Sequence, residues 1–173
     1  LLEHSGDLDA ALSAITRAIE LAPMDETLLV RRAHIGILTG QLSDAADSYH
    51  DLLELSPEDA DDWMKTAALL ISIGELPIYH QLCDDMLERF RQPEAQDTAE
   101  KIAKACLIVP PDESNLPAAV ELAKKSVADP DHWVMPYATM VRGLAEYRSG
   151  NFRVARDWSK RALEKKLAWH VEA

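Results

Sequence analysis

The sequence predicts an all-α protein, a helix–turn–helix repeat solenoid of about four to five repeats. The first observation is a fixed interval, because Gly6, Gly40 and Gly74 lie 34 residues apart, as do Pro23 and Pro57. A constant period of this length is typical of stacked repeats, in which each unit covers the apolar face of its neighbour. The second observation is apolar spacing of three and four residues, and the third is the absence of the alternating pattern of a half-buried strand.

The first five helices follow from this spacing and from end signals. Pro23 forbids continuation of the first helix, and Asp25 can cap the second. Gly40 can adopt the left-handed conformation that closes a helix. Acidic residues in the first turn favour the fourth helix, and Pro77 is tolerated in the first turn of the fifth. The expected helices cover residues 9–22, 26–40, 42–57, 58–74 and 76–90.

The pattern loosens in the rear half. Residues 93–109 read as a helix, 110–117 as a turn-rich loop, and 118–129 as a helix that ends by Pro130. The last clear pair is 135–150 and 151–166, hinged at Gly150, which follows Gly74 by 76 residues and so leaves about eight extra residues in the loop. We therefore expect one array over 1–173. It comprises a partial repeat (1–23), repeats at 24–57 and 58–91, a divergent repeat with the longer loop (92–130), a repeat at 131–166, and the start of a further helix (167–173).

Charge and cysteine content narrow the function classes. The 173 residues carry a net charge of −12. Residues 1–92 hold 18 acidic and 6 basic side chains, whereas 93–173 hold 12 of each. The acidic front half is expected to repel nucleic acid and anionic membranes, so neither is predicted as a partner.

Cys83 and Cys106 form no CxxC pair, which fits a reducing compartment and a cytoplasmic location.

These residues resemble the tetratricopeptide repeat (TPR), whose pattern is W-x2-L-G-x2-Y, then A-x3-F, then P. Trp63 fills the first slot, and the ending is matched by Ala45, Tyr49 and Pro57 and again by Ala11, Ile15 and Pro23. The last pair matches with Gly143, Tyr147, Gly150, Ala155 and Ala162. In this register Leu1 falls late in the first helix of a unit, so we expect a fragment of a longer array. Residues 79–90 and 98–110 loosely resemble large bacterial multidomain repeat proteins, some with Ser/Thr kinase or propeller modules.

The resemblance implies a concave groove lined by the first helix of each unit. The implied lining positions are Thr27, Val30, His34, Ile37 and Leu38, then Asp61, Met64, Ala68, Ile71 and Ser72. This strip is mostly apolar and suits a peptide or a partner helix, although some positions could instead face neighbouring helices. Some family members bind an acidic C-terminus through lysine and asparagine side chains. In this sequence the corresponding positions are occupied by Val30, His34 and Leu38. Capture of an acidic tail is therefore not expected.

A basic helical stretch near the C-terminus is a second candidate surface. Arg153, Arg156 and Lys160 recur at helical spacing, with Arg161, Lys165 and Lys166 nearby. They could dock on an acidic surface, including the front half of another copy, because head-to-tail contacts build rings or filaments. The alternative is an ordinary solvated helix face, which is the common reading of a charge run.

No residue pattern indicates chemistry. None of the six histidines forms HExxH or lies beside a catalytic glycine motif. His80 and Cys83 are three residues apart and could be metal ligands or a thiol with its base, but a buried inert cysteine is the better interpretation, also for Cys106. We expect no enzyme activity, no catalytic residue, no metal and no cofactor.

The sequence thus predicts a protein-interaction scaffold that binds a peptide or helix of unknown identity in an apolar groove. The alternatives are a self-assembly module, in which an acidic front half meets a basic rear helix, and a non-catalytic arm of a larger signalling enzyme such as a kinase. An exposed end position is expected for Trp133 or Trp169, whereas Trp63 and Trp158 are expected to fill gaps between helices.

Overall fold

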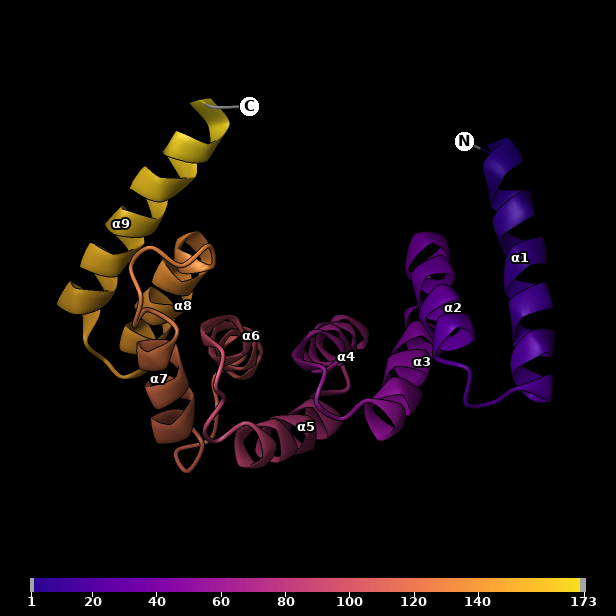
Figure 1. The fold of residues 1–173 in the computed structure, drawn as a ribbon, viewed down its shortest axis with the longest axis horizontal. Helices are drawn as coiled ribbons and strands as arrows, with labels where there is room; N and C mark the ends of the chain where they lie inside the picture. The colour runs from indigo at the N-terminus through magenta and orange to yellow at the C-terminus, as the bar shows by residue number, and fades with distance from the viewer. Residues whose placement is uncertain (1, 172–173) are drawn as a thin grey trace. The chain divides into compact units, whose positions relative to one another are not determined.

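The computed structural model describes the backbone of residues 2–171 and the side chains of residues 7–164. Within that backbone range the chain forms nine α-helices and no strand (Figure 1). The prediction of an all-α fold is therefore confirmed for the described residues. The helices are α1 (Leu2–Leu21), α2 (Glu26–Thr39), α3 (Leu42–Leu55), α4 (Ala60–Ile73), α5 (Leu76–Arg89), α6 (Gln96–Leu107), α7 (Leu116–Lys125), α8 (Met135–Arg148) and α9 (Phe152–Val171).

The same closing turn recurs at three helix ends. Gly40, Gly74 and Gly150 have φ angles of 79°, 82° and 77°, a left-handed conformation that a side chain would strain. In each turn the glycine N–H donates to a carbonyl three residues back, and the next N–H donates five residues back. For the first turn, Gln41 donates to the Gly36 oxygen at 2.7 Å. The regularly spaced glycines in the sequence thus mark positions where the same helix-closing turn recurs in the structure.

Helix starts follow the end signals in the sequence. Asp25 accepts a hydrogen bond from the Leu28 N–H at 3.1 Å, and Asp59 accepts one from the Asp61 N–H at 2.8 Å. These carboxylates satisfy backbone donors that a first helical turn leaves unpaired. At α7, Pro117 lies in the first turn, where its missing N–H costs nothing.

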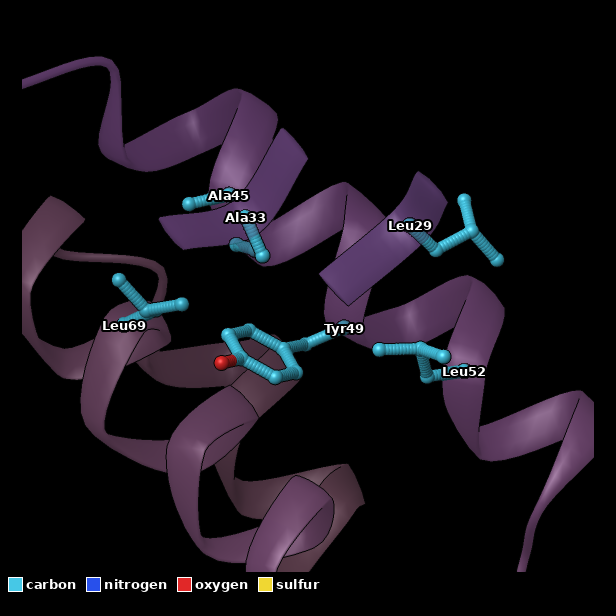
Figure 2. Close-up of a cluster of buried hydrophobic side chains, with 7 residues drawn as sticks. Leu29, Ala33, Ala45, Tyr49, Leu52 and Leu69 are labelled. Atoms are coloured by element: carbon cyan, nitrogen blue, oxygen red, sulfur yellow. The ribbon is translucent and has the colours of Figure 1, made fainter. Parts of the chain in front are cut away.

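The chain divides into two compact units, residues 1–79 and 80–173, and the boundary falls within α5. In the first unit, α1 packs on α2, α2 on α3, and α3 on α4. The centre of this unit is an apolar cluster whose seven members are all at most 7% exposed (Figure 2). They are Leu29, Ala33, Ala45, Ala46, Tyr49, Leu52 and Leu69.

In the second unit, α6 packs on α7 and α8, α7 on α8, and α8 on α9. The C-terminus of α6 is closed differently from the glycine turns, because no glycine follows it. Instead the Arg148 guanidinium of α8 donates to the Leu107 oxygen at 3.1 Å and to the Ile108 oxygen at 2.7 Å. An arginine from the following pair therefore satisfies carbonyls that a helix end leaves unpaired.

Three helix boundaries differ from those expected. α1 continues through Gly6, where the 34-residue spacing predicts a turn. α7 ends at Lys125 rather than near Pro130, and α9 runs unbroken to Val171, so residues 167–171 continue it instead of starting a further helix. Residues 172–173 lie outside the described part.

Candidate protein-interaction surfaces

The outward side of α2 carries the first set of expected groove residues. Thr27, His34 and Ile37 are exposed, and Val30 is half-buried. Ile37 exposes 43% of its surface and the adjacent Leu38 exposes 71%, whereas Leu29 on the other side of the helix is fully buried. The helix thus places its apolar core residues on one side and leaves further apolar residues in solvent.

The second set lies on α4 and shows the same division. Ala68 and Ser72 are exposed, and Asp61, Met64 and Ile71 are half-buried. The opposite side of α4 is buried through Trp63, Thr66, Ala67, Leu69 and Leu70. None of the ten expected groove positions is buried, so each can contact a partner. Their assignment to one binding groove stays a prediction.

The structural role of Trp63 separates it from the neighbouring Met64. Its indole is 7% exposed, and the ring N–H donates to the Pro57 oxygen at 2.9 Å. The side chain therefore fills the interior and ties the start of α4 to the preceding turn. Trp133 is 61% exposed, whereas the side chain of Trp169 lies outside the described residues.

The three basic residues of α9 that recur at helical spacing are all exposed. They are Arg153, Arg156 and Lys160. Arg156 pairs with Asp157 at 3.0 Å, but both side chains are more than half exposed, so water screens this pair. Behind them, the half-buried Trp158 ring contacts the guanidinium groups of Arg142 and Arg161, at 5.9 and 4.8 Å from its centroid. The Lys165 and Lys166 side chains lie outside the described range.

An apolar hollow that the sequence reasoning missed lies against α8 and α9. It has a volume of about 730 Å³. Three large apolar side chains in its lining are strongly exposed: Met140 by 53%, Tyr147 by 54% and Phe152 by 65%. The complete lining is Lys104, Ile108, Met140, Val141, Gly143, Leu144, Tyr147, Phe152, Ala155, Arg156 and Ser159.

A signal for this hollow was present in the sequence. Met140 and Tyr147 lie 110 residues after Val30 and Ile37, and Gly150 lies 110 residues after Gly40. Carrying the register of α2 into the last pair would have identified both residues as outward-facing. The hollow itself needed the structure, because its volume depends on how α8 and α9 pack.

The two cysteines are placed for packing. Cys83 and Cys106 are 3% and 1% exposed, and the Cys106 thiol lies 4.0 Å from the Cys83 carbonyl oxygen. Hydrogen bonding with Cys83, together with burial, raises the pKa of the Cys106 thiol well above its ordinary value of 9.0. A thiol in this state is a poor nucleophile, because the thiolate is the reactive form. Among the described residues, no three histidine, cysteine or acidic side chains are grouped so that they could hold a metal ion.

Lys104, which lines the hollow, pairs with the buried Glu100. Glu100 is 2% exposed and accepts hydrogen bonds from the Lys104 ammonium at 3.0 and 3.2 Å. Burial raises the pKa of Glu100, and the nearby Lys104 charge only partly opposes this effect. The pair therefore holds the Lys104 ammonium at the edge of the hollow.

None of the helices in the described part of the chain has the length and apolar content needed to cross a membrane.

Comparison with known proteins supports the fold. No family model matches the sequence, and no curated protein matches it. A crystal structure of MamA matches with a TM-score of 0.63 at 20% identity, over 95% of this chain and 85% of that one. MamA 41-end from Desulfovibrio magneticus RS-1 matches with 0.61 at 17% identity, over 94% and 88%. A tetratricopeptide repeat protein from Parabacteroides merdae ATCC 43184 matches with 0.64 at 18% identity, over 93% and 61%. The chain thus has the helical-repeat fold of TPR proteins.

Proposed function

We propose that the chain is a protein-interaction scaffold that binds a peptide or helix along the outward sides of α2 and α4. The observation that supports this most directly is the exposure of apolar side chains on helices whose opposite sides are packed. Ile37 and Leu38 are 43% and 71% exposed beside the fully buried Leu29. Apolar surface that folding leaves in water gains free energy when a partner covers it.

The mechanism needs no chemistry from the chain. Apolar residues of the partner would pack on Val30, Ile37, Met64 and Ile71. A methionine adapts its shape to different partners because its side chain is unbranched and flexible. Polar neighbours such as His34, which is exposed, would hydrogen-bond to the partner and fix its register.

The test is affinity capture from native lysate with the unmodified chain and with Met64→Glu, followed by mass spectrometry. The matched control is Ser43→Glu, which adds the same charge at an exposed position of α3. We expect one protein to be retained by the unmodified chain and by Ser43→Glu but lost with Met64→Glu. Circular dichroism must show that all three forms are equally folded. Equal capture by all three, or by none, would contradict the proposal.

Self-assembly is a second candidate, and the uneven charge distribution favours it. Residues 1–79 carry 15 acidic and 4 basic side chains, whereas Arg153, Arg156 and Lys160 are all exposed on α9. Opposite charges on two parts of one chain attract when copies meet. Sedimentation velocity would then show a mass that rises with protein concentration and falls in high salt. A constant monomer mass would exclude this candidate.

A further inference from the structure

The sequence contains two cysteines, and both belong to the second unit. Cys83 is on α5 and Cys106 is on α6. The Cys106 sulfur lies 4.0 Å from the Cys83 carbonyl oxygen, and the two thiols also share a hydrogen bond. The two side chains therefore point toward each other, as the formation of a disulfide requires.

The thiols lie in a closed, apolar part of the second unit. Cys83 and Cys106 are 3% and 1% exposed. One turn away on the same helices, Met86 and Ile102 are fully buried. Such close packing keeps out the thiols of other molecules and reagents of the size of glutathione. In the folded chain the reaction partner of each cysteine is therefore the other cysteine.

Hydrogen peroxide is small enough to suit this site, and it can oxidise a thiol pair in two steps. In the first step one thiolate attacks a peroxide oxygen, the O–O bond breaks, and a sulfenic acid and hydroxide form; the hydroxide takes up the thiol proton as water. In the second step the other thiol attacks the sulfenic sulfur, the S–S bond forms, the S–O bond breaks, and the oxygen leaves as water. The two sulfur atoms together lose two electrons, which the peroxide gains.

The surroundings of the thiols set the relative speed of the two steps. The hydrogen bond with Cys83 and burial raise the pKa of the Cys106 thiol, so the reactive thiolate is scarce and the first step is slow. The second step is fast, because the two thiols are already in contact. The sulfenic acid is thus consumed before it can be oxidised further.

We propose that Cys83 and Cys106 form a redox-modification site, a buried dithiol that hydrogen peroxide converts into a disulfide between α5 and α6. The proposal is independent of the scaffold function. The disulfide closes the loop over residues 83–106, which restricts the unfolded chain and so stabilises the second unit. Since α5 contains the boundary between the two units, the link fastens the rear part of this helix to the unit to which it belongs.

The test exposes the folded whole chain to hydrogen peroxide at neutral pH for increasing times. Catalase ends the reaction, and iodoacetamide in urea then labels every thiol that remains. Mass spectrometry of the peptides reads the two cysteines separately from any oxidised methionine. We expect one product, in which neither cysteine carries the label and the two cysteine peptides are joined with the loss of two hydrogen atoms. Dithiothreitol should restore both labels.

Cys83→Ala and Cys106→Ala are the matched controls, because each keeps one thiol in the same packed surroundings. Without a second thiol the sulfenic acid cannot form the disulfide, so the remaining cysteine should be recovered either labelled or as the sulfinic acid. Urea unfolding measures the effect of the link on the unmodified chain. The equilibrium constant for unfolding should be at least about tenfold lower in the oxidised chain than in the reduced chain.

Full labelling of both cysteines after treatment of the folded chain would overturn the proposal. Sulfinic acid at either cysteine of the unmodified chain would do the same, because the second thiol should intercept the sulfenic acid first. A disulfide between two chains would show that the thiols are not enclosed as described. An oxidised chain that is less stable than the reduced chain would show that the thiols are not positioned for the link, and would also refute the proposal.

Discussion

Replacing Tyr49 by alanine tests whether the repeat packing of the first unit is as described. Tyr49 of α3 is 1% exposed and lies in the cluster shared with Leu29 of α2 and Leu69 of α4 (Figure 2). A buried aromatic ring removes about 150–250 Å² from water, and at about 25 cal/mol per Å² this is worth about 4–6 kcal/mol. The Lys65 ammonium, 5.1 Å from the ring centroid, adds about 0.5–1 kcal/mol.

We therefore expect Tyr49→Ala to lower the free energy of unfolding by about 3–5 kcal/mol, which is a large share of the total for an ordinary domain. Urea unfolding followed by far-UV circular dichroism measures the change. Tyr49→Phe keeps the ring and should cost less than about 1.5 kcal/mol. Ser159→Ala, at the corresponding but exposed place in α9, should change the free energy by less than about 0.5 kcal/mol. A loss below about 1 kcal/mol for Tyr49→Ala would refute the packing.

Three further predictions concern the second unit. Because burial raises the pKa of Glu100 above its unfolded value, its ionisation costs stability as the pH rises through the range above about 4.5. Glu100→Gln should therefore gain stability relative to the unmodified chain between pH 4.5 and pH 7, measured by urea unfolding; a constant difference would contradict this. Arg148→Ala should cost about 1.5–3 kcal/mol in the same assay, because two carbonyls at the end of α6 lose a charged donor. Cys83 and Cys106 should resist a thiol reagent such as iodoacetamide at pH 7.5 and react fully in urea; mass spectrometry that finds either thiol modified in the native chain would contradict their burial.

The repeats could be predicted because their signals are local. The glycine turns at Gly40, Gly74 and Gly150 and the cap at Asp25 each depend on residues within a few positions. Such interactions leave a readable trace in residue type and spacing. The capping of α6 by Arg148 could not be predicted, because it joins residues about 40 positions apart that no local pattern connects.

For the candidate surfaces, too, the features encoded by local sequence could be predicted, and those that depend on packing could not. The outward positions of α2 and α4 follow from helical period, which places Met64 and Ile71 on one side and Trp63 and Leu70 on the other. The hollow at α8 and α9 depends on how these two helices pack against each other. Sequence period alone predicts that Met140 and Tyr147 face outward, but it does not predict the hollow that they line.

Photo-cross-linking from position 64 tests the scaffold account most directly. A photoreactive amino acid replaces Met64 in one form of the chain and Glu54, which is exposed on α3, in a second form. Both are irradiated in native lysate, and the products are identified by mass spectrometry. We predict that a defined partner is cross-linked from position 64 and not from position 54. Identical products from the two positions, or none from position 64, would contradict the claim that this side of α4 is a protein-binding surface.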